Sequence, residues 1–529
     1  MRNILICVTW LGLFGPDALS QPTFLTSFDP NLQDPFQADK GKDIWSIGKH
    51  VYVASGFVHD NGKRENQIFM VDADTRQIVK EIKYMGPQGD MTITDYMVTS
   101  DQHILLAGEW RNYAAGGRMC LFLTKLTPDL ETVWINYYPD LSTHYLYCEG
   151  IAETGAGDYM LCIADSPPPA PHATGELRMI KTDTSGTILL DKMLTDTFTQ
   201  TAGYGNMIPT DDGHFLVSTF VIGYYYHPIQ GTFRYNTVLH KIDAEANQVW
   251  TKTLNYAKFD RQGPVCAPLA GGGGAVMWRK DTFGVVGPEV AWEFSLMYGM
   301  DSDGNIDWTR EWNTWPYKIV YQVKQANNGD ILGVGYYRDS GGWPNKGKGW
   351  LFRMTNAGEP LWERHYSDSL LRPWSPHLEL LDLCEMDDGR IAATGIVVDT
   401  NEVSWNLNVA LLIIDANGCI EPGCSGPTQY VTSTSVPLYS LPPLPVLHIS
   451  PNPTSGPVSI TLPEGLVPGK ETYELLGYAT DGRLLKRLAW PPGSPTLQVA
   501  DWGQTNGIVR LLLLDQGRPV AAGKFSVHR

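Results

Sequence analysis

One hairpin motif recurs seven times along the chain, and this repeat constrains the fold more than any other feature of the sequence. Each copy consists of an apolar strand, a tight turn and a returning strand. The turns begin at Asp72, Thr127, Asp183, Asp243, Asp301, Thr355 and Asp415, which are 54 to 60 residues apart. A period of this length indicates repeated supersecondary units that bury their apolar faces by stacking on one another.

The turn residues fit this interpretation. Asp or Thr at the first turn position accepts hydrogen bonds from the backbone that follows, and four copies have glycine three residues later, where a type I turn favours it. The returning strand carries tryptophan at one aligned position in four copies: Trp134, Trp250, Trp308 and Trp362. We expect these rings to pack between neighbouring repeats rather than to contact a ligand.

A second element precedes each hairpin, again seven times and in the same phase: a short polar turn followed by a strand of small and apolar residues. Each repeat therefore supplies four strands. Four-stranded antiparallel sheets that stack radially bury both of their faces and leave only short edges. The sequence thus predicts an all-β fold, a seven-bladed β-propeller over residues 21–425.

The last repeat lacks a good fourth strand, because the chain after Gly418 reads CIEPGC, which is short and interrupted by proline. The favoured donor of this strand is PTFLTSF, residues 22–28, which would close the ring by joining the two ends of the repeat region. The alternative donor is QYVTSTSV, which begins at residue 429.

The charge balance limits the possible partners. The chain has 40 Lys and Arg against 57 Asp and Glu, which gives a net charge of -17. This charge repels phosphate backbones and anionic membrane surfaces, and no basic patch offsets it. We therefore expect no nucleic-acid partner.

Residues 1–20 have the pattern of a secretory signal peptide. Arg2 precedes an apolar stretch over residues 4–15, and Ala18-Leu19-Ser20 provides a small-residue cleavage site before Gln21. A retained membrane anchor is the less favoured alternative, since a bilayer span needs about 20 apolar residues. We expect a mature protein without a transmembrane segment that is secreted or held at the outer cell surface.

Export to an oxidising compartment permits disulfides. Cys419 and Cys424 are close enough to close a small loop and form the expected pair. Cys148 and Cys162 would face each other in one hairpin and are either bridged or only packed. The other cysteines of the repeats are expected to be small buried apolar residues: Cys120, Cys266 and Cys384.

The C-terminal part has a different character. Residues 426–445 form a linker rich in Pro, Ser and Thr, for which we expect an extended spacer. Residues 446–529 alternate apolar strands with glycine turns, which predicts a small, Ig-like β-sandwich.

Several motifs of this C-terminal segment occur in a characteristic order: Pro451, Asn452, Pro453 and Gly456 near its start, Gly482 in a middle turn, Gly507 before an apolar strand and Lys524 in the last strand. With them the segment resembles the C-terminal sorting domain of proteins exported by the type IX secretion system of Bacteroidetes-type bacteria. Val509 departs from the family, which commonly has Tyr there. The resemblance implies passage through the periplasm, recognition by the type IX machinery at the outer membrane, and removal of the domain or its exchange for a surface anchor. The repeats also resemble those of uncharacterised secreted propellers that share this C-terminal segment.

The connections between the second and third strands of several repeats are long and aromatic. In a propeller these connections surround one end of the central channel, which is the usual ligand-binding face. Flat rings beside Asp and Asn suit stacking on sugars or contacts with proteins. Alternatively, the loops fold over one another and bury their rings. The candidate ligand-binding residues are Trp110, Tyr113, Tyr224, Tyr225, Tyr226, Trp343 and Trp405.

The sequence contains no motif that assigns a reaction, and the catalytic residues are unknown. Gly271–Gly274 lacks the Lys-Ser/Thr pair of a phosphate loop, and the acidic run at residues 301–307 is interpreted as a hairpin turn rather than a calcium loop. No histidine or cysteine set has metal-ligand spacing, so we expect no metal and no cofactor.

Two main functions remain. The first is a binding propeller that contacts a glycan or an extracellular protein, and the second is an extracellular glycan hydrolase or lyase on the same scaffold. A structural role at the cell surface stays open as a third possibility. Carboxylates that converge at the channel with raised pKa values would favour the enzyme.

Overall fold

The computed structural model describes most of the repeat region and much of the C-terminal segment. The described residues are 24–28, 40–58, 64–84, 91–112, 117–139, 141, 145–166, 176–194, 201–227, 232–258, 264–281, 293–312, 317–338, 347–368, 377–401, 404–420, 424, 428–431, 445–463, 466, 473–478, 484–491, 493–500, 502, 507–515 and 518–527. Among these residues the structure is all β, apart from the short 3-10 turn Ala270–Gly272. The chain divides into two compact units, Met1–Leu438 and Tyr439–Arg529.

The first unit is built from successive four-stranded antiparallel sheets, and one parallel pair, Gly347 with His377, joins the last two of them into a larger sheet. The first two sheets contain β2 (Lys40–Ile47), β3 (His50–Val58), β4 (Arg64–Asp72) and β5 (Gln77–Tyr84), then β6 (Met91–Val98), β7 (Ile104–Asn112), β8 (Arg118–Leu126) and β9 (Thr132–Tyr138). The next two contain β10 (Tyr145–Glu153), β11 (Tyr159–Ser166), β12 (Glu176–Thr182) and β13 (Ile188–Met193), then β14 (Thr201–Pro209), β15 (Phe215–His227), β16 (Thr232–Ile242) and β17 (Gln248–Lys258).

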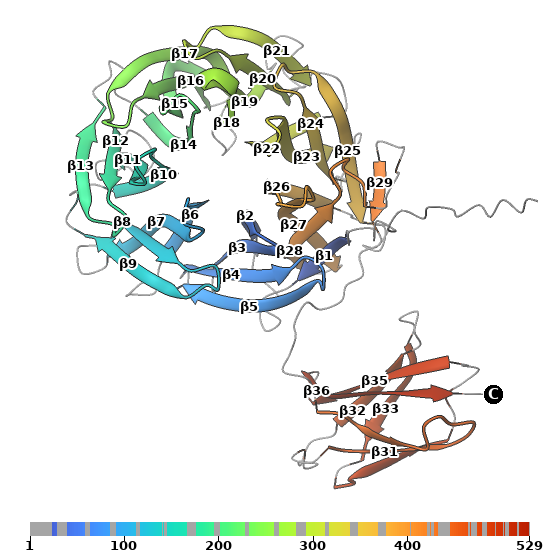
Figure 1. Cartoon of the computed structure of the whole chain (residues 1–529). Coiled ribbons are helices and arrows are strands. Elements are labelled where there is room, and N and C mark those ends of the chain that lie inside the picture. Colours follow the sequence, from blue (N-terminus) through green and yellow to red (C-terminus); the bar gives the residue numbers. More distant parts are fainter. Residues whose placement is uncertain are drawn as a thin grey trace, which may run out of the picture. The chain divides into compact units, whose positions relative to one another are not determined.

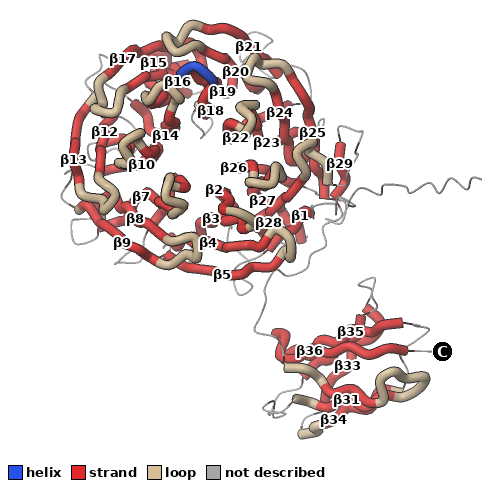
Figure 2. Tube along the Cα trace, in the orientation of Figure 1, coloured by secondary structure: helices blue, strands red, loops and turns tan. Residues whose placement is uncertain are grey.

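The same order continues to the end of the repeats. A further sheet contains β18 (Val265–Leu269), β19 (Gly273–Asp281), β20 (Glu293–Met300) and β21 (Ile306–Trp312). It is followed by β22 (Tyr317–Gln325), β23 (Ile331–Arg338), β24 (Gly347–Met354) and β25 (Pro360–Asp368), and then by β26 (His377–Glu385), β27 (Ile391–Asn401) and β28 (Ser404–Ile414). The sheets lie radially around a central axis, with β2, β6 and β10 among the innermost strands and β5, β9 and β13 among the outermost (Figures 1 and 2).

The fourth strand beside β28 comes from the other end of the repeat region. β1 (Phe24–Phe28) pairs antiparallel with β28, from Phe24 opposite Ile413 to Phe28 opposite Val409. The structure therefore confirms the favoured segment as the donor of this strand, through residues 24–28, and not the segment after residue 428. The described part of the first unit is thus a propeller-like arrangement in which an N-terminal strand completes the last sheet.

The segment expected to be a spacer contains one packed element. β29 (Thr428–Val431) pairs in parallel with the outer strand β25, beginning with Thr428 opposite His365. The composition of the linker predicted no such contact, and on this point the prediction was wrong. The physical reason is that β25 is an outer strand whose free edge offers unpaired backbone groups to any nearby extended segment.

The apolar cores lie between neighbouring sheets, as the stacking argument requires. Ile44 and Val51 of the β2–β5 sheet share one core with Val409 and Leu411 of β28. Every buried apolar side chain is worth roughly 1.5–3 kcal/mol relative to its exposed state. Because each sheet contributes to the core on either side of it, the stability of the ring comes from contacts between sheets.

The repeated tryptophans link successive sheets at their outer strands. The indole Nε1–H donates to a backbone carbonyl in the next repeat's turn, over 3.1 Å from Trp134 to Thr184 and 3.2 Å from Trp308 to Asn356. Trp250 and Trp362 make the same bond to Ser302 and Ala416. The prediction that these rings pack between repeats is confirmed.

The cysteines divide as follows. Cys419 and Cys424 are joined by a disulfide with their Cα atoms 5.6 Å apart, which confirms the predicted pair. Cys148 and Cys162 are free and buried, so of the two alternatives the structure supports packing. The free cysteines Cys120 and Cys266 are buried, and Cys384 is partly buried.

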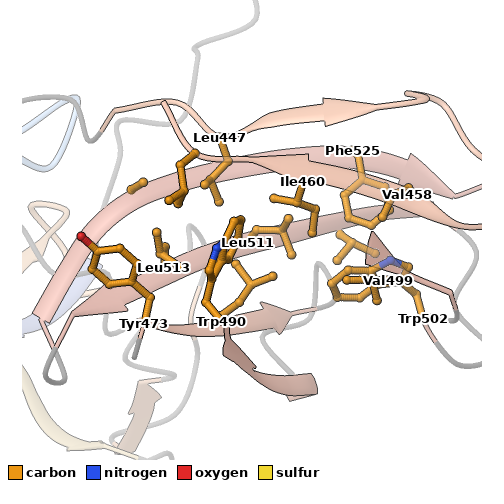
Figure 3. Packing of buried hydrophobic residues seen from close by; sticks show 14 of the residues in the cluster. Leu447, Val458, Ile460, Tyr473, Trp490, Val499, Trp502, Leu511, Leu513 and Phe525 are labelled. Atoms are coloured by element: carbon orange, nitrogen blue, oxygen red, sulfur yellow. The ribbon is translucent and has the colours of Figure 1, made fainter. Parts of the chain in front are cut away.

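The second unit consists of two sheets that share one core. The smaller sheet contains β30 (His448–Ser450), β31 (Val458–Thr461) and β34 (Thr496–Val499), and the larger contains β33 (Leu484–Trp490), β32 (Tyr473–Tyr478), β35 (Gly507–Asp515) and β36 (Arg518–Val527). Figure 3 shows Ile460 of β31 close to Trp490 and Leu511 of the other sheet. Val509, at the position where the resembling family has Tyr, is fully buried in this core.

Candidate functional site

The structure describes the side chain of one of the predicted ligand-binding residues, Trp110. β7 continues to Asn112, so Trp110 lies within a strand; it is 6% exposed, and its ring meets Tyr137 edge-on at 5.3 Å between centroids. Trp110 is therefore a core residue and not an exposed ring, which corrects its assignment to the ligand face. Tyr113 and Trp343 lie outside the described residues. The backbones of Tyr224, Tyr225 and Tyr226 belong to β15 and that of Trp405 to β28, but their side chains also lie outside the described part.

The predicted sorting motif contacts the last strand of the second unit. The Asn452 side-chain Oδ1 accepts a hydrogen bond from the Ser526 N–H at 3.0 Å, and the Thr454 N–H donates to the Ser526 carbonyl at 2.9 Å. The Thr454 hydroxyl also bonds to the backbone of Gly456. Residues 452–454 thereby hold the C-terminal end of β36.

The other motif residues lie at separate places in this unit. Pro451 and Pro453 flank Asn452 in the same segment, and Gly507 begins β35 with a positive φ of 119°. Lys524 lies in β36 opposite Arg510. Gly482 is outside the described residues.

On the inner strands of the first unit, a β-bulge recurs at one aligned position and changes which side chains face the axis. The register shifts between Gly41 and Asp43 in β2, between Ile93 and Asp95 in β6, and between Leu380 and Asp382 in β26. In each of these strands the residue that follows the bulge is an aspartate. Together with Tyr96 and Lys324, these three carboxylates form what we call the inner-wall cluster.

Two of the three carboxylates join neighbouring sheets through the same kind of bond. Asp382 accepts a hydrogen bond from the Ile44 N–H at 2.9 Å, and Asp95 accepts one from the Ile151 N–H at 2.7 Å. In both cases the donor lies one residue beyond the aligned position of the next sheet. Asp43 has no hydrogen bond or ion pair with any described residue.

Tyr96 and Lys324 connect strands that are not neighbours in the ring. The Lys324 ammonium pairs with Asp382 at 2.8 Å, bonds to the Tyr96 hydroxyl and lies 5.1 Å from the centre of the Tyr96 ring. The Tyr96 hydroxyl in turn donates to Asp382 at 2.8 Å. Since Lys324 is on β22 and Tyr96 on β6, with β26 and β2 between them, this network ties four inner strands together (Figure 1).

Two carboxyl groups of the inner-wall cluster, those of Asp43 and Asp95, have raised pKa values. Burial, with repulsion from Asp382 added, raises the pKa of Asp43 to about 8, and burial raises the pKa of Asp95 to about 7. Both residues retain some exposed surface, but the surrounding protein excludes most of the water that would solvate an ionised carboxylate. At neutral pH the Asp43 carboxyl is therefore mainly protonated and is a hydrogen-bond donor.

A second polar cluster lies at one end of the β22–β25 sheet. The register places Lys318 opposite Tyr337 and Tyr337 opposite Lys348, and we call these three residues the lysine–tyrosine row. The Lys348 ammonium lies 5.6 Å from the centre of the Tyr337 ring, and the Lys318 ammonium lies 5.7 Å from that of Trp350. All three residues of the row are partly exposed.

Two further titratable groups border the lysine–tyrosine row. Glu363 pairs with Lys318 and contacts His365 Nε2 at 3.2 Å, and these two partners hold the pKa of Glu363 below its usual range although its burial acts the other way. The His365 ring lies 4.0 Å from that of Tyr337, between centroids. Lysine ammoniums can donate hydrogen bonds to a ligand, and an exposed aromatic ring offers it an apolar face.

Sequence reasoning missed both clusters, although each left a signal. The inner-wall aspartates occupy one aligned position in the first, second and last repeats, and the alignment of the first strands alone contains that pattern. Lys348 is the second residue of β24, directly after the loop that contains Trp343, and its charge is the signal for the second cluster. No group of three or more His, Cys, Asp or Glu side chains in the described part of the chain is arranged to hold a metal ion. None of the described helices is long and apolar enough to cross a membrane.

No known protein family matches the chain, and no curated protein matches it. Among solved structures, it is similar to a Dyadobacter fermentans protein of unknown function (9% identity, TM-score 0.39), over 61% of this chain and 94% of that one. It is similar to the Penicillium chrysogenum α-L-arabinanase (12% identity, TM-score 0.39), over 63% and 95%, and to the β-propeller domain of the Trilobed protease from Pyrococcus furiosus (10% identity, TM-score 0.38), over 71% and 95%. The assignment of the fold rests on the strand pairing of this chain.

Proposed function

We propose that this chain is a seven-bladed propeller that acts outside the cell as a glycan-binding module. Its ligand face is the end of the sheets where the long aromatic connections lie, and its Ig-like C-terminal domain directs its export by the type IX route. The observation that carries the binding proposal is the lysine–tyrosine row, which presents an aromatic ring and two hydrogen-bonding ammoniums at the ends of β22, β23 and β24. Two of its members, Tyr337 and Lys348, flank the loop that contains Trp343.

The inner-wall cluster contains two carboxyls with raised pKa values, Asp43 and Asp95, which by the criterion stated above favours an enzyme, but the bonds made by Asp95 and Asp382 favour a structural role for these two. A glycosidase needs one carboxyl as acid and a second carboxylate as base or nucleophile, both accessible to the substrate. Asp382 is 2% exposed and accepts bonds from Ile44, Tyr96 and Lys324, and Asp95 is bonded to the backbones of Tyr96 and Ile151. The hydrogen bonds of these two carboxyl groups join the inner strands, so neither group is free to act on a substrate.

The test of binding is a glycan array probed with the chain from Gln21 onward, followed by titration calorimetry on the glycans that bind. We expect saturable binding of a defined set of glycans that is lost when Tyr337 is replaced by Ala. Failure to bind any glycan, with the protein folded, would contradict the proposal. The matched control is Tyr137→Ala, because Tyr137 packs against Trp110 in a core away from the row.

The export proposal is tested by removing residues 446–529 from the gene in a bacterium with a type IX system. We expect the truncated protein to accumulate in the periplasm, and the full chain to reach the medium or the cell surface. Substituting Asn452 by Ala, which removes the bond to Ser526, tests the motif without deleting the domain. Delivery of the truncated protein to the surface would contradict the assignment.

A hydrolase on the same scaffold is the second candidate, and one observation favours it. Asp43 has a pKa of about 8 beside a neighbouring carboxylate, Asp382, that is paired with Lys324, and such a separation of roles suits an acid and its partner. Turnover of any glycan that binds, abolished by Asp43→Asn with binding retained, would establish this function. Binding without turnover would exclude it for those glycans.

A further inference from the structure

In the second unit, the larger sheet carries apolar residues on both of its faces along β35. Leu511 and Leu513 belong to the core shared with the smaller sheet. The alternation of the strand therefore places Leu512 and Leu514 on the opposite face, which we call the outer face. A sheet with a core on one side only alternates apolar and polar side chains, whereas a continuous apolar run such as residues 511–514 is typical of a strand that is covered on both faces.

Two positive charges lie beside each other on the outer face. Arg510 of β35 is directly opposite Lys524 of β36, and both side chains are exposed. Neither of them makes a hydrogen bond or an ion pair with a described residue. Like charges directly opposite each other in a sheet are destabilising. The pairing therefore lowers the stability of the domain, and a partner that brings negative charge to this face relieves the repulsion.

The charges and the apolar residues form adjacent rows across the sheet. Tyr478 of β32 extends the charged row, because it lies opposite Arg510. In the next row Leu476 lies opposite Leu512. Residues 446–529 contain eight Lys and Arg against six Asp and Glu, in a chain whose net charge is -17. The outer face thus fits a partner that has acidic groups beside an apolar surface.

We propose that the outer face is the surface by which the export machinery recognises this domain, through a protein component that presents carboxylates to Arg510 and Lys524 and an apolar patch to Leu512. The inference rests on the proposed export function and adds the face that is recognised and the chemistry of the partner. Carboxylates form charge-assisted hydrogen bonds with both cations. A protein surface fits better than a lipid surface, because Leu512 and Leu514 are only partly exposed in a flat sheet and would have to insert below the lipid headgroups.

The experiment replaces Arg510 by Glu in the full chain and follows export in a bacterium with a type IX system. The introduced carboxylate lies opposite Lys524 and turns a repulsion into an attraction. We therefore expect hydrogen exchange of the β35 and β36 amides in the purified chain to slow by up to about fivefold. The fraction of the chain that reaches the surface or the medium should nevertheless fall by about tenfold, the effect of losing one charge-assisted hydrogen bond to the partner. A purely structural role of Arg510 predicts that stability and export change in the same direction.

Two further variants locate the effect. Arg510→Lys keeps the positive charge and should retain most of the export. Gln498→Glu adds a carboxylate to an exposed position of β34 in the smaller sheet, on the other side of the domain, and should leave export unchanged.

The outcomes separate this inference from the function on which it rests. Normal export of Arg510→Glu, while deletion of residues 446–529 still blocks export, would overturn the inference and leave the export function standing. Export of the shortened chain would overturn both. Equal losses in Arg510→Glu and Gln498→Glu, or faster hydrogen exchange in Arg510→Glu, would overturn the proposed site. Binding of the purified chain to vesicles of phosphatidylcholine and phosphatidylglycerol that Arg510→Glu abolishes would assign the face to a lipid surface and overturn the protein partner.

Discussion

At the scale of single residues, Asp43 differs from its two counterparts in the inner-wall cluster. Asp95 and Asp382 follow the same bulge and accept hydrogen bonds from the backbone of the next sheet. The Asp43 carboxyl makes no hydrogen bond or ion pair with a described residue. Ionising a carboxyl that is mostly shielded from water and makes no ion pair costs free energy. The Asp43 carboxyl therefore stays protonated up to a higher pH. The charged forms of both Asp43 and Asp95 are disfavoured in the folded state, and the rise in pKa is larger for Asp43.

The pH dependence of stability follows from this. The pKa of Asp43 is about 8 in the folded protein and about 3.9 in an unfolded chain. As the pH rises from 4 to 8, the unfolded state loses its proton before the folded state does, so the folded state is progressively destabilised. We expect Asp43→Asn to increase the free energy of unfolding at pH 8 by on the order of 3 kcal/mol and so to raise the melting temperature. At pH 4 we expect the substitution to change both quantities little.

Thermal unfolding followed by calorimetry at a series of pH values checks this prediction. The control is Asp303→Asn, which changes an exposed carboxylate in a turn. A stabilisation by Asp43→Asn that is equal at pH 4 and pH 8, or a destabilisation at pH 8, would contradict the assignment of the raised pKa.

At the scale of elements, the repeat encodes a contact between a tryptophan and a glycine of the next sheet. Gly358 has a φ of +80°, and a Cβ there would come within 2.6 Å of the Trp308 ring. Gly418 and Gly304 stand in the same relation to Trp362 and Trp250. Glycine is required at these turns for two reasons, the backbone conformation and the indole that covers it.

Alanine substitutions separate the effect of the positive φ on stability from the effect of the contact with the indole ring. Gly329→Ala introduces strain alone, since its φ is +87° and nothing lies within 4 Å of the added Cβ, and we expect a loss of about 1 kcal/mol. Gly358→Ala adds the clash with Trp308, and we expect a further 1–3 kcal/mol. Denaturant unfolding measures both. In the double variant with Trp308→Leu the further loss should shrink, and losses that simply add would show that the contact carries no energy.

How far the sequence predicts this molecule depends on whether a feature follows the period of the repeat. The four strands of each repeat, the tryptophan contacts and the donor strand at residues 22–28 all follow from aligned apolar positions and turn residues. The inner-wall cluster does not, because a β-bulge shifts the alternation by one residue and so changes which side chains face the axis. The pairing of β29 with β25 joins segments about 60 residues apart without any local pattern. Trp110 was misassigned because its strand runs further than the polar residues around it suggest.

At the scale of the whole first unit, the two ends of the repeat region meet at the sheet that contains β1 and β28. The junction between this sheet and the next has no tryptophan contact of the repeated kind among the described residues. Polar bonds cross it instead: Asp382 to the Ile44 N–H, and the guanidinium of Arg390 to Asp74 at 2.9 Å. Arg390 is 2% exposed, whereas the side chains of its partners Asp74 and Asp388 are 50% and 34% exposed, so its removal would leave a void and not a buried unpaired carboxylate.

The strand pairing predicts that the closed unit depends on β1. A chain that begins at Asp29 lacks β1 and leaves the edge of β28 unpaired over five residues. At roughly 0.5–1.5 kcal/mol for each backbone hydrogen bond, we expect the first unit to lose a few kcal/mol relative to a chain that begins at Gln21. Hydrogen exchange should show the loss first at the β28 amides of residues 409–413, and a peptide of residues 22–28 added in excess should restore their protection. Unchanged exchange in the shortened chain would mean that β1 does not hold the last sheet.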